Sequence, residues 1–310
     1  MIKRALFLGS KKFGLELLKT LINANKKICW AIASPPNSED TGGRISDFDA
    51  LSKEKGFNFT VVKSSEETAH YARTNQVDIM IVCGYYRILP KELINIIPQG
   101  VWGIHNSLLP KYRGGSPLVW QIINGEKYLG SSFFQFNEYV DAGPVLAQIR
   151  IPNIPVKSID QALNFLENKW IKELPKHWNN ICTGNAKPIQ QEHSDATYCA
   201  QRFELDGQLD WNKNAFYIDC FIKAQMSPYP KAFFFLDNKK ILVEQHETDD
   251  RIVYGTNGQV FEIKKSYVSI CCGGNTIIKL KKLQVNGRIL QAREVFSSIK
   301  QRIKFNYKKS

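Results

Sequence analysis

The sequence lacks a long hydrophobic run. None of its 310 residues lies in a stretch that approaches the roughly 18 to 20 consecutive apolar residues that a membrane-spanning helix requires. Basic and then apolar residues open the chain, as in a signal peptide, but the apolar part is too short for one and stops at Gly9. We therefore expect a first β-strand there and a protein that does not enter a membrane.

The cysteines lack a metal-binding pattern. There are 7 of them, an odd number, and the closest pair, Cys271 and Cys272, is adjacent rather than spaced as Cys-x-x-Cys. Several lie inside apolar strand or helix patterns, where a thiol behaves as a small hydrophobic group. We therefore expect no metal site, reduced cysteines and a cytoplasmic location.

Negative charge is also scarce. The chain has 42 Lys and Arg against 29 Asp and Glu, a net charge of +13, and most of the excess follows Cys199. A basic C-terminal part suits RNA or another anionic ligand. The lysines are scattered, however, so a solvated basic surface explains them equally well.

Apolar runs alternate with amphipathic segments through the first half of the chain. This alternation predicts an α/β fold, with a mostly parallel sheet and helices on both faces. The expected strands are 3–8, 28–33, 57–62, 77–83, 101–104, 131–136 and 149–154, and the expected helices include 47–55, 66–74 and 91–97. Gly9 and Gly14 do not match the G-x-G-x-x-G fingerprint, so a dinucleotide site is not supported.

The second half of the chain changes character. A long amphipathic helix is expected over 158–181, ended or kinked by Pro175. Further on, a helix at 215–224 precedes short strands at 232–236, 240–245, 259–263, 268–272 and 276–285, a spacing that predicts a small barrel of the OB type. We therefore expect a catalytic domain over 1–185, a linker over 186–198 and a smaller, β-rich, OB-like domain over 199–310.

The most closely specified stretch is 103–148. His105 follows an apolar strand, and open α/β sheets place their chemistry at the carboxyl ends of strands. Asp141 follows later, in a turn after the apolar run 131–136, so the two residues meet in one cleft if their strands are neighbours. A carboxylate beside an imidazole orients it and helps it to hold and hand over a proton. The alternative is a core hydrogen bond for His105 and a turn cap for Asp141.

Many ordered matches in this stretch resemble the folate-dependent formyltransferase family, which includes methionyl-tRNA, glycinamide ribonucleotide and amino-sugar formyltransferases. The matching residues are 105–114, Trp120, 123–126 and 141–143. The resemblance implies the formyltransferase fold and transfer of a formyl group from 10-formyltetrahydrofolate, as cosubstrate, to a primary amine. It also implies that His105 and Asp141 manage the proton.

The same resemblance implies where the pterin of 10-formyltetrahydrofolate binds. Backbone groups of two segments would hold it, and their residues are Ile88, Leu89, Pro90, Asn137, Glu138, Tyr139, Val140 and Asp141. Without the resemblance, the first of these segments is simply a loop that leads into a helix.

One position departs from the family pattern Asn-x-His, because Gly103 stands where the Asn is expected. That amide would bind the developing oxyanion, and loss of such a donor costs on the order of 10² to 10³ in rate. Asn106 is the candidate substitute, although its odd spacing from Gly103 turns it to the other side of an extended strand. Three interpretations stay open: formyl transfer with another donor, hydrolysis of 10-formyltetrahydrofolate, and a folate-binding protein that has lost catalysis.

Two sequence features bear on the amine that is formylated. Methionyl-tRNA formyltransferases usually carry a basic insertion after the second strand, but residues 35–44 hold more acid than base, the wrong sign for tRNA phosphates. This loop and residues 85–87 resemble amino-sugar formyltransferases, so a small-molecule amine, a nucleotide-linked amino sugar, is our first expectation. The basic C-terminal part and the segment 206–211, which resembles the tRNA enzyme, keep methionyl-tRNA as the second. A homodimer is compatible with either.

Overall fold

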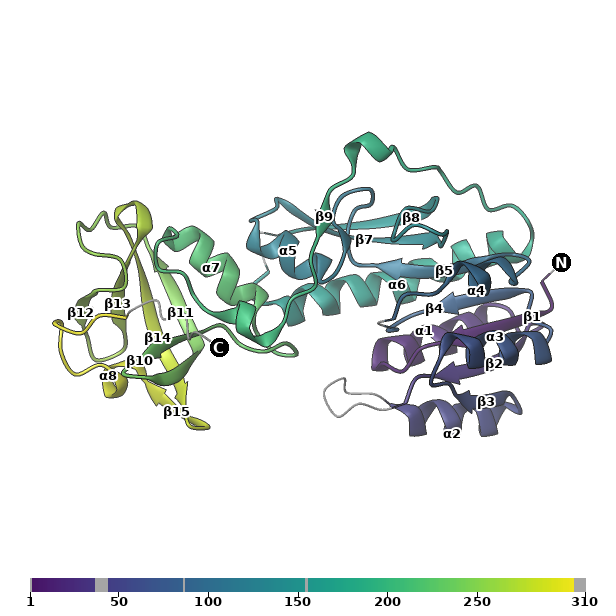
Figure 1. Cartoon of the computed structure of the whole chain (residues 1–310), viewed down its shortest axis with the longest axis horizontal. Coiled ribbons are helices and arrows are strands. Elements are labelled where there is room, and N and C mark those ends of the chain that lie inside the picture. The colour runs from purple at the N-terminus through teal and green to yellow at the C-terminus, as the bar shows by residue number, and fades with distance from the viewer. Residues whose placement is uncertain (1, 37–43, 86, 154–155, 304–310) are drawn as a thin grey trace. The chain divides into compact units, whose positions relative to one another are not determined.

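The computed structural model describes residues 2–36, 44–85, 87–153 and 156–303, and the chain divides into two compact units (Figure 1). Unit 1 comprises Met1–Pro117, Gly130–Ile151 and Asn164–Cys199, and unit 2 comprises Leu118–Leu129, Pro152–Leu163 and Ala200–Ser310. Tyr86 and residues 37–43, which belong to the two segments that resemble amino-sugar formyltransferases, lie outside the described residues.

Within the described residues, unit 1 is built on a seven-stranded sheet of order β3-β2-β1-β4-β5-β7-β8. The strands are β1 (Arg4–Leu8), β2 (Cys29–Ser34), β3 (Asn58–Val61), β4 (Ile79–Val82), β5 (Val101–His105), β7 (Tyr128–Gln135) and β8 (Val145–Pro152). Strands β1 to β5 run parallel, whereas β7 pairs antiparallel with β5. The expected mostly parallel α/β sheet is therefore confirmed.

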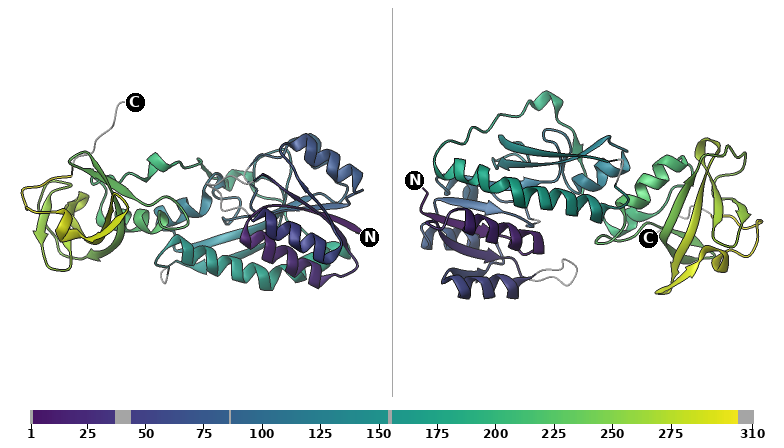
Figure 2. Two further views of the ribbon diagram at one scale, coloured as in Figure 1. Left: turned by 90° about the horizontal axis from the view of Figure 1, so that it is seen from below. Right: turned by 180° about the vertical axis from the view of Figure 1, so that it is seen from behind.

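Helices cover both faces of this sheet, because successive strand residues point to opposite sides. Leu6 of β1 lies in a buried cluster with residues of α3 and α4, whereas Phe7 stacks on Phe48 of α2 with 5.8 Å between ring centroids. On the same face of the sheet as Phe7, Trp30 packs against Trp178 of α6, with 5.3 Å between ring centroids. Figure 2 shows α1 and α6 side by side. The helices before residue 183 are α1 (Lys12–Ala24), α2 (Ile45–Lys55), α3 (Ser65–Thr74), α4 (Lys91–Asn95), α5 (Pro117–Ile123), nearly all of which belongs to unit 2, and α6 (Ile159–Cys182), which begins in unit 2.

Helix α6 runs through Pro175 to Cys182, close to the expected bounds of 158–181. Of the two effects expected of Pro175, an end of the helix is wrong, whereas a kink stays a prediction. A proline inside a helix costs roughly 3 kcal/mol or more, since it removes one hydrogen bond and crowds the preceding turn. Here Trp170, Leu174 and Trp178 follow one another at helical spacing and are almost fully buried. We infer that burial of this apolar face offsets the cost of the proline.

Unit 2 contains an antiparallel sheet and the ten-residue helix α7 (Ala215–Ala224), at the bounds that the sequence predicts. The sheet order is β10-β11-β14-β13-β12, and β15 pairs with β14. These strands are β10 (Phe233–Leu236), β11 (Lys239–Asp249), β12 (Val260–Ile263), β13 (Val268–Cys272), β14 (Thr276–Val285) and β15 (Arg288–Gln291). The smaller, β-rich C-terminal domain is thereby confirmed.

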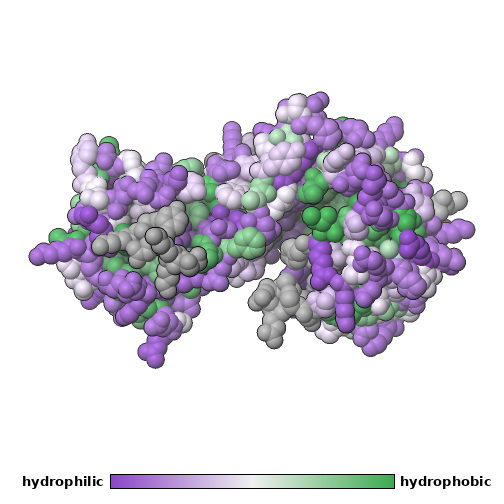
Figure 3. All heavy atoms as spheres, in the orientation of Figure 1, coloured by the Kyte–Doolittle hydropathy of each residue, from purple (hydrophilic) through white to green (hydrophobic). Residues whose placement is uncertain are grey.

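The surface, the helices and the cysteines each bear on what the sequence led us to expect. Hydrophilic side chains predominate on the face drawn in Figure 3. In the parts of the chain that the structure describes, no helix is long and apolar enough to cross a membrane, and no cluster of three or more His, Cys, Asp or Glu has metal-holding geometry. The cysteines are free thiols, and five of them are buried.

Replacing Trp178 with Ala should lower the free energy of unfolding by roughly 3 to 5 kcal/mol, because the change empties a fully buried position. Phe165→Ala on the same helix is the matched control. That side chain is 47% exposed, so its loss should cost no more than about 1 kcal/mol. Urea unfolding followed by circular dichroism measures both values, and equal losses would contradict the packing of α6 beyond Pro175.

Candidate active site

His105 is the last residue of β5, between β4 and β7 in the sheet. It pairs with Ser132 of β7, so the two strands that the sequence expected to be neighbours do lie side by side. The His105 side chain is only 10% exposed. Its surroundings therefore come almost entirely from the protein.

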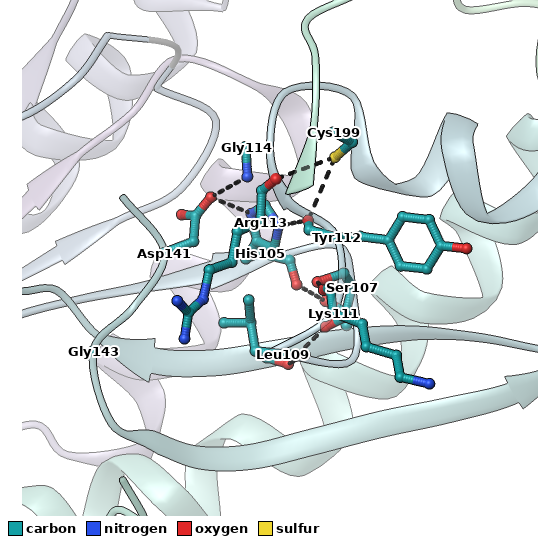
Figure 4. Close-up of polar contacts among 12 residues, drawn as sticks. His105, Ser107, Leu109, Lys111, Tyr112, Arg113, Gly114, Asp141, Gly143 and Cys199 are labelled. Carbon is teal, nitrogen blue, oxygen red and sulfur yellow. Dashed lines mark hydrogen bonds and ion pairs between the residues drawn. The ribbon is translucent and has the colours of Figure 1, made fainter. Parts of the chain in front are cut away.

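The imidazole of His105 lies between two acceptors (Figure 4). Its Nε2 is 2.8 Å from the carbonyl oxygen of Tyr112, and its Nδ1 is 3.4 Å from Oδ2 of Asp141. A carbonyl oxygen only accepts, so Nε2 donates and carries a proton. Nδ1 then faces a carboxylate that can orient the ring and stabilise a second proton there. The structure thus brings His105 and Asp141 together.

Both acceptors sit on backbone that a non-glycine residue rarely adopts. Tyr112 has φ of 59° and Asp141 has φ of 52°, in the left-handed region. Such conformations are costly and gather at functional sites, where the surrounding structure holds them in place. We infer that the two loops are held in these conformations to present their oxygens to His105.

Gly114 completes this arrangement. Its N–H donates to Oδ2 of Asp141 at 2.8 Å, the same oxygen that faces His105. The residue has φ of 104°, and a Cβ there would lie 2.4 Å from the carbonyl oxygen of Cys199. Only glycine fits this close approach.

Serine hydroxyls fix the loop after His105. Ser107 Oγ donates to the carbonyl oxygen of Lys111 at 2.7 Å, and Ser132 Oγ donates to that of Ser107 at 2.6 Å. The Leu109 N–H donates to Ser132 Oγ at 3.1 Å. The turn that carries the Tyr112 carbonyl is therefore tied both to itself and to β7.

Asn106, the candidate oxyanion donor, contacts β7. Its Oδ1 accepts a hydrogen bond from Ser131 Oγ at 3.0 Å, and that hydroxyl accepts in turn from Nε1 of Trp170 at 2.9 Å. A donor role for Asn106 requires its amide nitrogen to face the pair formed by His105 and Asp141.

The space beside Gly103 is filled by an aromatic ring. A Cβ at Gly103 would lie 2.6 Å from Cε1 of Phe136, so the ring stands where a side chain at this position would go. Phe136 stacks on Phe134 with 4.8 Å between centroids, and Phe134 is edge-on to His105 at 6.4 Å. An aromatic wall therefore replaces the amide that the resemblance led us to expect.

The residues expected to hold folate are only partly gathered around one cavity. A cavity of about 410 Å³ lies between α4 and the segment after β7, and its size suits a small-molecule ligand. Asn137, Glu138 and Tyr139 line it, together with residues of α4 and Phe136. Outside its lining, Leu89 is buried, Ile88 and Val140 are exposed, and Pro90 caps α4.

An ion pair joins the two expected folate segments. Lys91, directly after Pro90, pairs with Glu138, and both side chains line the cavity. The hydrogen bond with Glu138 and the attraction of its charge raise the pKa of Lys91. Because both groups are exposed, we expect the pair to contribute little to stability.

Sequence reasoning missed the residues that lie behind Asp141. Arg113 is 3% exposed, and its Nη2 lies 2.7 Å from Oε1 of Gln191 and 3.1 Å from Nδ1 of His193. Gln191 donates to the Asp141 carbonyl oxygen at 2.9 Å. No local pattern in 186–198 distinguishes these residues from a polar linker, so only the folded chain identifies them.

A short parallel pair of strands brings this segment to the site. The strands are β6 (Arg113–Gly114) and β9 (Tyr198–Cys199). Cys199 Sγ lies 3.5 Å from the carbonyl oxygen of Tyr112. Burial, and less strongly the charge of Asp141, raise the pKa of the Cys199 thiol to about 11. This thiol is therefore protonated near neutral pH and is no nucleophile.

Comparison with known families agrees with the geometry. A family model described as "Formyl transferase" matches residues 3–175, and one described as "Formyl transferase, C-terminal domain" matches residues 204–300. The methionyl-tRNA formyltransferase of Pelagibacter ubique (strain HTCC1062) is 28% identical over 296 residues, 93% of this chain and 93% of that protein. That of Lachnospira eligens is 25% identical over 92% of this chain and 93% of its own.

Solved structures share the fold. An N-formyltransferase from Helicobacter canadensis, in complex with folinic acid and dTDP-3-aminofucose, has a TM-score of 0.67 at 17% identity over 91% of this chain and 99% of its own. HypX from Aquifex aeolicus, a variant structure, has a TM-score of 0.66 at 16% identity over 95% of this chain and 47% of its own. Methionyl-tRNA formyltransferase from Clostridium thermocellum has a TM-score of 0.57 at 16% identity, covering 80% of this chain and 95% of that one.

Gly103→Asn should lower stability by roughly 1 to 3 kcal/mol, because the new side chain and the Phe136 ring compete for one space. The exchange should lower activity as well. Adding Phe136→Ala should recover part of the lost stability, which a double-mutant cycle measures by urea unfolding. Gly56→Asn is the control, since nothing lies within 4 Å of a Cβ there and Asn tolerates a φ of 70°. A rise in activity for Gly103→Asn alone would contradict this account.

Proposed function

Because the chain belongs to the formyl transferase family, whose members take the formyl group from 10-formyltetrahydrofolate, we propose that it formylates the primary amine of a nucleotide-linked amino sugar. The observation that carries the chemistry is the His105 ring between the Asp141 carboxylate and the Tyr112 carbonyl oxygen. The identity of the amine that accepts the formyl group is the more specific part of the proposal.

In the proposed reaction, the amine nitrogen gains the formyl carbon and loses a proton, and N10 of the folate, the leaving group, gains one. His105 relays that proton, and Asp141 stabilises the doubly protonated ring while it does so. Buried surroundings strengthen this interaction, because little water competes for either group.

We propose that the oxyanion of the tetrahedral intermediate is bound without a side chain at position 103. In this proposal the Nε2–H of His105 exchanges the Tyr112 carbonyl oxygen for the oxyanion and is one donor, and the amide nitrogen of Asn106 is the second. The aromatic wall of Phe134 and Phe136 contributes no hydrogen bond, so these donors carry the stabilisation that an additional amide would otherwise share.

The cavity of about 410 Å³ is the proposed cosubstrate site. Its lining combines apolar side chains of α4 and Phe136 with polar groups of the segment after β7, a mixture that suits a pterin ring. We propose that backbone groups of 88–90 and 137–141 hold that ring. The Lys91–Glu138 pair links the two segments at this site.

The preference for an amino sugar rests on charge. In the sequence 35–44, the two acids Glu39 and Asp40 outnumber the single base Arg44, whereas a tRNA-binding segment would need excess positive charge. The Helicobacter canadensis enzyme, which shares this fold across 99% of its length, was solved with dTDP-3-aminofucose. We propose the same class of acceptor here, a cytoplasmic location, and the division of the chain into a catalytic part over 1–185, a connection over 186–198 and a C-terminal domain over 199–310.

Methionyl-tRNA is the second candidate acceptor. The curated relatives named above are methionyl-tRNA formyltransferases that align over more than nine-tenths of both chains. The net charge of +13 would also favour an RNA partner.

An acceptor screen decides between these candidates. Purified protein with 10-formyltetrahydrofolate should formylate dTDP- or UDP-linked amino sugars, detected by mass spectrometry, and leave methionyl-tRNA unchanged. A tRNA complex with six or more phosphate contacts would weaken ~10³-fold or more between 50 and 200 mM salt. Substantial formylation of methionyl-tRNA without any reaction of amino sugars would reverse the order of the candidates.

Replacing His105 with Ala should abolish turnover while calorimetry still detects binding of the reduced folate, because the imidazole is outside the cavity lining. His70→Ala is the matched control, since His70 is exposed on α3 and distant in sequence from the site. Turnover that survives in His105→Ala would remove the acid-base role.

Asn106→Asp and Asn106→Ala separate the donor role of Asn106 from its contact with Ser131. Asp keeps an oxygen that can accept from Ser131 but lacks the amide N–H groups, whereas Ala lacks both. If Asn106 is an oxyanion donor, both variants should lose on the order of 10² in turnover with folding intact. Activity retained in Asn106→Asp would limit Asn106 to a structural contact.

A further inference from the structure

The Gln191 side chain, near the site, forms hydrogen bonds through both its amide oxygen and its amide nitrogen. It is 8% exposed, and its Oε1 accepts from Nε of Arg113 at 3.1 Å and from Nη2 of Arg113 at 2.7 Å. Its Nε2 donates to the carbonyl oxygens of Asp141 at 2.9 Å and Gly143 at 2.6 Å. One amide thus uses two acceptor and two donor positions, which is its full capacity.

Its partner Arg113 is a buried cation whose described contacts are neutral groups. Besides Gln191, these are His193 Nδ1 at 3.1 Å and the Tyr198 hydroxyl at 3.5 Å. A guanidinium that is 3% exposed requires strong acceptors, because burial removes its hydration. The amide oxygen of Gln191 supplies the shortest of them, so the orientation of Gln191 is fixed by Arg113.

That orientation determines where the amide nitrogen points. It points at the turn that contains Asp141, whose φ of 52° needs support from its neighbours. The carboxylate of Asp141 is bound by the N–H of Gly114, the residue after Arg113. Strand β6 therefore holds Asp141 at two points, directly through Gly114 and indirectly through Arg113 and Gln191.

We propose that Gln191 is a positioning residue for formyl transfer: it ties the Asp141 turn to the buried Arg113 and so sets the distance between Asp141 and His105. This inference rests on the proposed roles of His105 and Asp141. The segment after α6 is then part of the catalytic machinery as well as a connection to the rest of the chain.

Gln191→Glu tests this role while keeping the shape of the side chain. The carboxylate still accepts from Arg113, and it also compensates the buried charge, so the chain should fold. It cannot donate to the two carbonyl oxygens, and its second oxygen repels them. The matched control is Gln190→Glu, the same exchange at the exposed neighbouring position.

The expected result is a fall in kcat of about 10- to 100-fold in Gln191→Glu, because a displacement of about 1 Å at a catalytic group can cost that much. KM for 10-formyltetrahydrofolate should change less than kcat, since Gln191 does not line the cavity and its contact with the proposed folate segment 137–141 is at Asp141, the last residue of that segment. Gln190→Glu should match the wild type in both constants.

A second measurement does not depend on the acceptor. The ring signal of His105 in an NMR spectrum, assigned by its absence in His105→Asn, should move in Gln191→Glu and stay in place in Gln190→Glu. Should Gln191→Glu not fold, Gln191→Asn is measured instead. It keeps the amide, but it is too short to reach both Arg113 and the Asp141 turn.

The outcomes are distinct. A His105 signal that does not move in the Gln191 variant overturns the inference, whether or not kcat falls, because Gln191 then acts elsewhere. A signal that moves while kcat stays at the wild-type value overturns it as well. If the wild type formylates no acceptor, the proposed function fails, and the NMR comparison alone still decides whether Gln191 positions Asp141.

Discussion

The structure of the site depends on the position of the His105 imidazole between two oxygen atoms, the carbonyl oxygen of Tyr112 and a carboxylate oxygen of Asp141. Asp141 and Tyr112 supply them from backbone conformations that are unfavourable for residues with a side chain. The neighbouring contacts offset that cost, since Gly114 binds the carboxylate and hydroxyls of Ser107 and Ser132 brace the loop. A histidine held between two oxygens is restricted in orientation, as the proposed proton transfer requires.

Gly103 and the ring of Phe136 are packed together as one unit beside His105. A glycine alone would leave an opening beside His105, but the ring of Phe136 fills it and stacks on Phe134. Phe136 also lines the cavity of about 410 Å³, so the same ring contacts both the strand of His105 and the proposed cosubstrate site. This wall is therefore apolar and packed at the place where the family pattern led us to expect an amide.

The site is assembled from segments that are distant in the chain. The contact between Arg113 and Gln191 spans 78 residues, and the pairing of β6 with β9 brings the end of unit 1 back to the loop after His105. The family membership accounts for the catalytic fold and for the formyl donor, but it does not identify the acceptor, because similar proteins include a methionyl-tRNA formyltransferase and an N-formyltransferase solved with dTDP-3-aminofucose. The residues around His105 therefore do not by themselves identify the formyl acceptor.

The sequence by itself determined the features that arise from local patterns. Apolar periodicity placed α7 at Ala215–Ala224 and β14 at Thr276–Val285, and the run of motifs from His105 to Asp141 indicated the formyltransferase fold. The amphipathic pattern over 158–181 predicted α6, but only the tertiary structure decided that Pro175 does not end it, that Phe136 fills the space of Gly103, and that Gln191 supports Asp141. These three depend on contacts between distant residues, whose burial energies outweigh local preference and leave no periodic signal in the chain.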